Sequence, residues 1–92
     1  MILKSPFMFV TDEHALKLCL DISKKMMEDF NVTYDESIER INRHWSHVDE
    51  INEESIVFHE TAEFWAYDIY YGMSSRWWNR IGDKTLRPVP IE

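Results

Sequence analysis

The sequence predicts a small, mostly α-helical protein: a bundle of three or four helices with a short N-terminal arm or minor strand. Apolar residues recur at helical spacing in three separate stretches of the chain. A threonine able to cap a helix precedes each stretch. Two glycines and three prolines in 92 residues leave little material for tight hairpins. With 45% hydrophobic residues, we expect one globular domain over residues 1–92.

The first helix is expected near residues 12–30, after an apolar arm formed by residues 1–10. Thr11 is the predicted N-cap. One face of this helix collects its apolar side chains, which are those of Ala15, Cys19, Ile22, Met26 and Phe30. Cys19 is the only cysteine, so it cannot form an internal disulfide. We therefore expect a buried, unreactive thiol and a reducing compartment.

The second helix is expected near residues 34–48. Thr33 and Glu36 have the spacing of a capping box, in which each side chain bonds to the other's backbone N–H. An apolar stripe follows, made of Tyr34, Ile38, Ile41, Trp45 and Val48. Residues 49–55 are expected to form a loop or a frayed extension of the helix. Residues 55–58 are expected to form either a short strand, which could pair with the N-terminal arm in a minor hairpin, or an apolar loop that leads into the next helix.

The third helix is expected near residues 61–72, with Thr61 as N-cap and Gly72 as its stop. A short fourth helix is expected near residues 75–81. Eight of the thirteen aromatic residues fall between positions 58 and 78. We predict that Trp45 and Trp65 anchor the core, with Ala66 and Ile69 also facing inward. The rim candidates for a binding surface are Tyr67, Tyr71 and Trp78, because Tyr and Trp are enriched at interface hot spots.

The net charge of −7 comes from one segment. Residues 33–63 hold nine acidic residues and two basic ones, and the rest of the chain is neutral. Such a field repels nucleic acid and favours a basic protein partner. The candidate partner-binding acids are Asp35, Glu39, Asp49, Glu50, Glu53 and Glu54. An ordinary solvated helix face is the alternative interpretation of the same charges.

Catalytic and metal-binding patterns are weak. The chain has no Gly-x-Ser-x-Gly elbow and no glycine-rich phosphate loop. The segment from His59 to Glu63 resembles a zincin motif only in part, because a second histidine is missing four residues after the first. We therefore predict no enzyme activity and no cofactor, and keep metal binding by His59 and Glu63 as a remote alternative.

The expected location is the cytoplasm. No stretch approaches the roughly 20 apolar residues of a membrane span. The N-terminal residues lack the charge and apolar pattern of a signal peptide.

Residues 41–78 contain three short strings in order: INRHW, then HE-x-x-x-FWA-x-x-IYYG, then WW. This pattern resembles small bacterial immunity proteins that accompany secreted polymorphic toxins and mobile gene cassettes. The resemblance implies a cytoplasmic helical protein that binds and neutralises a toxin, possibly a nuclease, without catalysis. Two other interpretations stay open: a structural or adaptor domain whose aromatics only pack, and a homodimer that buries its third helix against a second copy.

Overall fold

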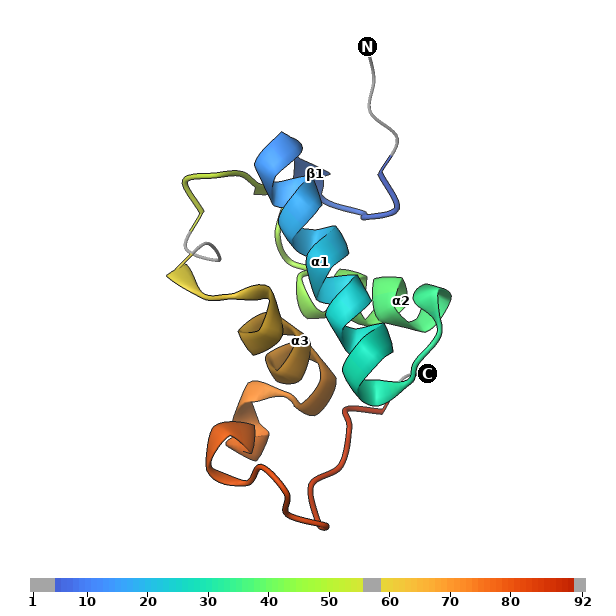
Figure 1. Ribbon diagram of the computed structural model, residues 1–92. Coiled ribbons are helices and arrows are strands. Elements are labelled where there is room, and N and C mark those ends of the chain that lie inside the picture. Colours follow the sequence, from blue (N-terminus) through green and yellow to red (C-terminus); the bar gives the residue numbers. More distant parts are fainter. Residues whose placement is uncertain (1–4, 56–58, 91–92) are drawn as a thin grey trace.

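The computed structural model describes residues 5–55 and 59–90 (Figure 1). Its elements follow in the order β1 (Val10–Thr11), α1 (Glu13–Phe30), α2 (Tyr34–His44), β2 (Glu50–Ile51) and α3 (Ala62–Tyr71). Two 3-10 turns come next, η2 (Met73–Ser75) and η3 (Trp77–Asn79). The mostly helical fold with a minor strand is confirmed.

Side-chain caps set the helix starts. The Asp12 carboxylate accepts a hydrogen bond from the Ala15 N–H at 2.8 Å, so Asp12 is the N-cap of α1 and the prediction of Thr11 is wrong. Asp12 has the stronger claim because its charge also favours the positive end of the helix dipole. Thr33 and Thr61 cap α2 and α3 as predicted, each accepting from the N–H three residues on.

The helix ends differ more from the sequence prediction. Asn31 ends α1 in a left-handed conformation, with φ of 57°. Gly72 ends α3 as predicted, with φ of +82°. However, α2 stops at His44 and not near position 48, because Trp45 leaves helical geometry and the chain turns back through Val48 toward β2. The predicted fourth helix is replaced by η2 and η3, since Arg76 adopts a left-handed φ of 52° between them.

The two strands form a parallel pair and not a hairpin. Val10 lies opposite Glu50, and Thr11 lies opposite Ile51. The Val10 N–H donates to the Asp49 carbonyl at 2.9 Å. The strand partner is thus part of the segment predicted to be loop or frayed helix. Most of the segment predicted to be a strand, residues 56–58, lies outside the described residues.

Helix α1 contacts both α2 and α3 (Figure 1). What we call the main core is a set of buried side chains contributed by the arm, all three helices and β2: Phe7, Phe9, Ala15, Cys19, Ile22, Met26, Ile38, Ile41, Trp45, Ile51, Ala66 and Ile69. Burial of Trp45 is confirmed, and its ring meets Phe9 edge to face. Trp65 packs against this core but is only half-buried, so it anchors the fold less than predicted.

The C-terminal segment returns to the helices. The Val89 N–H donates to the Tyr70 carbonyl at 2.7 Å, and the buried Arg40 guanidinium donates to the Val89 carbonyl at 2.6 Å. Arg40 also pairs with Glu36 and lies over the Tyr70 ring. A Cβ at Gly72 would lie 3.1 Å from the Val89 side chain. Glycine therefore suits position 72 for two reasons: a larger side chain would crowd Val89, and a positive φ is unfavourable for other residues.

Candidate functional site

The aromatic residues of α3 and η3 form a connected group of rings. Trp77 lies at its centre, 5.5 Å from Phe64 and 5.3 Å from Tyr67 between ring centroids. Tyr67 continues to Tyr71 at 6.1 Å, and Trp77 continues to Trp78 at 5.7 Å. The three aromatics predicted to bind a partner are therefore brought to one region of the molecule.

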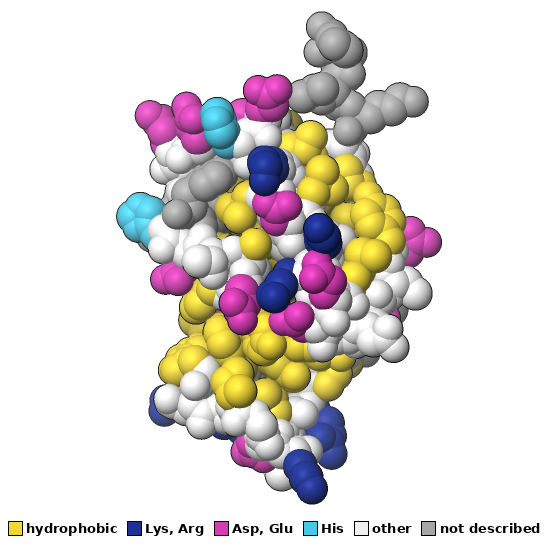
Figure 2. Space-filling model, in the orientation of Figure 1, with side chains coloured by type: hydrophobic (Ala, Val, Ile, Leu, Met, Phe, Trp, Pro, Cys, Tyr) yellow, Lys and Arg dark blue, Asp and Glu magenta, His cyan; other side chains and the backbone are white. Residues whose placement is uncertain are grey.

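This region is hollowed. A groove of about 400 Å³ is lined by Thr61, Glu63, Phe64, Tyr67, Trp77 and Ile81, and we call it the aromatic groove. Trp77 is buried, whereas Phe64 and Tyr67, whose rings both contact it, are half-buried. Figure 2 shows hydrophobic side chains gathered over α3 and the turns below it, with acidic and basic side chains intermixed at their border toward α1.

Hydrogen bonds hold two of the rings. The Trp77 indole N–H donates to Asp68 Oδ1 at 3.0 Å, and the Tyr67 hydroxyl donates to Asp29 Oδ2 at 3.2 Å. Burial, together with the Asp29 carboxylate that accepts this bond, raises the pKa of Tyr67. The hydroxyl is thus kept protonated as a donor, and the ring positions follow from specific bonds as well as from packing.

Asp68 is the residue that the sequence prediction missed. Its side chain is fully buried, and Oδ2 has no hydrogen-bond partner among the described residues. The nearest cationic candidate is His44, whose Nε2 lies 3.9 Å from Oδ2. Burial lowers the pKa of His44, while the Asp68 charge opposes that shift. A carboxyl group one position before the core residue Ile69, the only charged side chain in residues 64–71, was the available sequence signal.

The predicted acidic residues do not form one surface with the aromatics. Asp35 and Glu39 lie on α2, where they line a different hollow together with Met8 and Ile38. The other four acids lie beyond α2 around β2 and are all exposed, namely Asp49, Glu50, Glu53 and Glu54.

These exposed acids meet the start of α1. The Glu53 N–H donates to Asp12 Oδ2, and the Glu53 carboxylate lies 3.2 Å from His14 Nδ1. Figure 2 shows acidic side chains at this end of the molecule and Lys and Arg at the opposite end. None of these four acids is among the described residues that line the aromatic groove.

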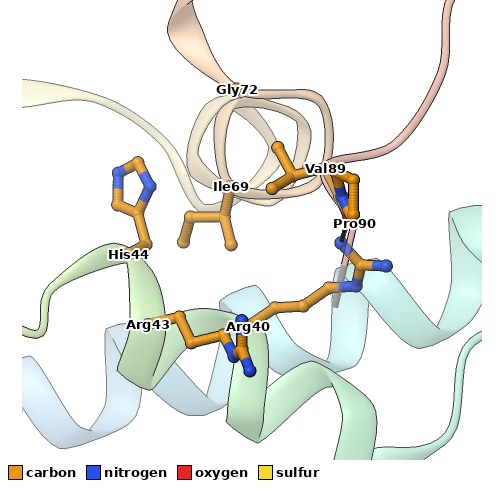
Figure 3. Close-up of a pocket in the computed structure, with 7 residues that line it drawn as sticks. All are labelled: Arg40, Arg43, His44, Ile69, Gly72, Val89 and Pro90. Carbon is orange, nitrogen blue, oxygen red and sulfur yellow. Dashed lines mark hydrogen bonds between the residues drawn. The ribbon is translucent and has the colours of Figure 1, made fainter. Parts of the chain in front are cut away.

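A third hollow, of about 160 Å³, lies where the C-terminal segment meets α2 and α3 (Figure 3), and we call it the C-terminal hollow. Its polar residues are Arg40, Arg43 and His44, and its apolar side is formed by Ile69, Val89 and Pro90. In Figure 3 the Arg40 side chain runs to the backbone of Val89, to which it donates its hydrogen bond. Val89 and Pro90 of the C-terminal segment form one side of this hollow, so it exists because that segment packs against the helices.

The metal alternative gains no support from geometry. His59 is exposed ahead of α3, and Glu63 lies at the rim of the aromatic groove. Within residues 5–55 and 59–90, no three His, Cys, Asp or Glu side chains are grouped to hold a metal ion. Over the same described ranges, no helix has the length and apolar character needed to cross a bilayer.

Comparison of the chain with protein-family models, with curated proteins and with solved structures finds no match in any of the three.

Proposed function

We propose that the chain is a non-enzymatic, cytoplasmic protein-binding module of the immunity type, which binds and neutralises a basic toxin protein. The aromatic groove carries this proposal. It combines half-exposed rings, hydrogen bonds that fix them and an acidic residue at the rim. Interface hot spots are enriched in Trp and Tyr held in such surroundings. The resemblance of residues 41–78 to immunity proteins supports the same class of function.

The acidic residues have a separate part in this proposal. Because they lie mostly at the end of the molecule formed by β2 and the start of α1, they act on encounter through the field. Charges at a distance from the contact mainly change the association rate and its salt dependence, whereas buried anchors mainly change the dissociation rate. The two groups of residues therefore predict two separable kinetic effects.

The experiment begins with affinity capture from the source cells, followed by binding kinetics against the purified captured protein. A first variant reverses charge at Glu50, Glu53 and Glu54 by substitution with lysine. It should associate more slowly at low salt and nearly normally at high salt. Glu28→Lys, on the exposed side of α1, is the matched control. It should change the association rate much less.

A second pair of variants, Tyr67→Ala and Trp78→Ala, should speed dissociation while leaving the fold intact. If neither group of substitutions changes binding, the groove is not the contact. If no partner is captured and sedimentation shows a dimer that Trp78→Ala dissociates, the self-association interpretation replaces this one. A monomer without a partner would instead favour the structural or adaptor interpretation.

A further inference from the structure

We infer that the aromatic groove is built to hold one cationic side chain, an arginine or lysine of the protein partner. The inference rests on the proposed function for the source of that side chain, but the groove's preference for a cation can be measured without the partner. Four observations carry it: the arrangement of the rings, their hydrogen bonds, the charges of the groove lining and the contrast with the C-terminal hollow.

Three aromatic rings line the groove together, those of Phe64, Tyr67 and Trp77. Phe64 and Tyr67 are inclined to the Trp77 ring by 62° and 39°, so neither is stacked flat on it. A cation within about 6 Å of an aromatic centroid is attracted by the negative face of the ring. Tryptophan gives the strongest attraction of this kind, and Trp77 is one of the rings that line the groove.

The hydrogen bonds strengthen this arrangement in two ways. They hold Trp77 and Tyr67 before a ligand arrives, which lowers the entropy lost on binding. The Asp68 carboxyl group that accepts from the Trp77 N–H is also fully enclosed, and a hydrogen bond shielded from water is stronger than an exposed one.

Among the described residues that line the groove, Glu63 is the only charged one. The Asp29 carboxylate, which accepts the hydrogen bond of Tyr67, is itself paired with Lys25 at 3.6 Å and so adds little net charge. The C-terminal hollow has a lining of the opposite sign, since Arg40 and Arg43 line it. The lining of the aromatic groove therefore favours a cation, and that of the C-terminal hollow does not.

The test uses N-acetyl-arginine methylamide as the probe and N-acetyl-citrulline methylamide as its neutral counterpart of the same shape. Binding is followed by the NMR signals of the indole N–H groups in the full chain, at constant ionic strength. The Trp77 signal is assigned with Trp77→Phe. The arginine probe should shift the Trp77 signal along a saturable curve, and citrulline should bind at least about fivefold more weakly.

Two variants locate the effect. Glu63→Gln should weaken arginine binding by about two- to fivefold, the range of an exposed charge pair, whereas Glu60→Gln outside the groove should not. Tyr67→Leu keeps an apolar side chain but removes the π face, and it should reduce the preference for arginine over citrulline. The indole signal of Trp45, buried in the main core, reports whether each variant remains folded.

The outcomes separate the two proposals. Equal binding of arginine and citrulline, or no shift of the Trp77 signal, overturns the cation site even if a protein partner binds. Selective arginine binding supports the cation site even if no toxin is captured. If a captured partner binds through the groove, replacing its inserted basic residue by glutamine should raise the dissociation rate, and an unchanged rate for every basic contact residue overturns the inference.

Discussion

The main core and the aromatic groove follow opposite rules. In the core, side chains such as Ile22, Met26 and Ile41 are fully enclosed and carry no hydrogen-bond donor that needs a partner. In the groove, the rings of Phe64 and Tyr67 remain half-exposed, and hydrogen bonds at ring edges hold Tyr67 and Trp77. A core needs only volume and shape, whereas a hydrogen bond at a ring edge also fixes the orientation of the ring. The packing of the core and the orientation of the groove rings therefore depend on different interactions.

The largest expected effect is the loss of a core tryptophan. Trp45→Ala should lower the free energy of unfolding by about 3–5 kcal/mol, because it removes a buried ring and leaves a cavity. Domains of this kind have total stabilities of about 5–15 kcal/mol, so the variant could be largely unfolded. Trp65→Ala should lose less, because that side chain is half-buried, and Tyr67→Ala least, because Tyr67 is half-buried and, unlike Trp65, is not one of the side chains packed against the main core. Urea denaturation of the three variants checks this order, and an equal loss at Tyr67 would erase the distinction between the two regions.

Asp68 links the two regions and is expected to have the next largest effect. Asp68→Ala leaves the buried Trp77 N–H without its acceptor, which should lower the free energy of unfolding by about 1–3 kcal/mol. Asp68→Asn keeps an acceptor at the position of Oδ1 and should be clearly more stable than the alanine variant. Denaturation curves of both variants test this, and equal stability of the two would show that the Trp77 hydrogen bond contributes little.

Substitutions at two glycines test how closely the C-terminal segment packs against α3. Gly72 and Gly82 both have left-handed φ angles, of +82° and +87°. Alanine at either position should lower the free energy of unfolding by about 1 kcal/mol or more through backbone strain. Only at Gly72 would the new Cβ also meet the Val89 side chain. The loss should therefore be larger at Gly72, and thermal melts giving the reverse order would exclude a close fit of this segment.

The smallest expected effect is a pH dependence at His44, where α2 ends beside Asp68. Burial lowers the pKa of His44 below its ordinary value of 6.5. The unfolded chain then binds a proton at a pH where the folded chain does not. The part of the free energy of unfolding that depends on a neutral His44 is therefore fully present above pH 6.5 and is lost as the pH falls below it. His44→Gln should flatten the decrease in stability between neutral and mildly acidic pH. The exposed His59→Gln should not, and identical profiles for both variants would contradict the assignment.

The sequence predicts the parts of this fold that depend on local pattern. The stripe through Cys19 and Ile22, and the caps at Thr33 and Thr61, are read from spacing alone and are confirmed. The early end of α2 and the parallel pairing of Val10 with Glu50 are not local, because each depends on where Trp45 packs and how the chain returns. Periodicity carries no information about such long-range pairing.

The candidate site shows the same division. The aromatic richness of residues 58–78 predicts that rings gather here, and Tyr67, Tyr71 and Trp78 do belong to one connected group of rings. The sequence could not show that Trp77 lines the groove, since this follows from its bond to Asp68 across the left-handed turn at Arg76. Nor could it separate the acids by position, because sequence neighbours in residues 33–63 lie on different elements.

The lone thiol gives this molecule a reporter of its own motion. Cys19 has no exposed surface, and burial raises its pKa to about 12. At neutral pH an alkylating reagent therefore meets neither an accessible sulfur nor a thiolate while the chain is closed. Because α1 packs against both α2 and α3, Cys19 can be modified only when α1 separates from those two helices. The rate of labelling at this one atom then counts openings of the bundle, without an introduced probe.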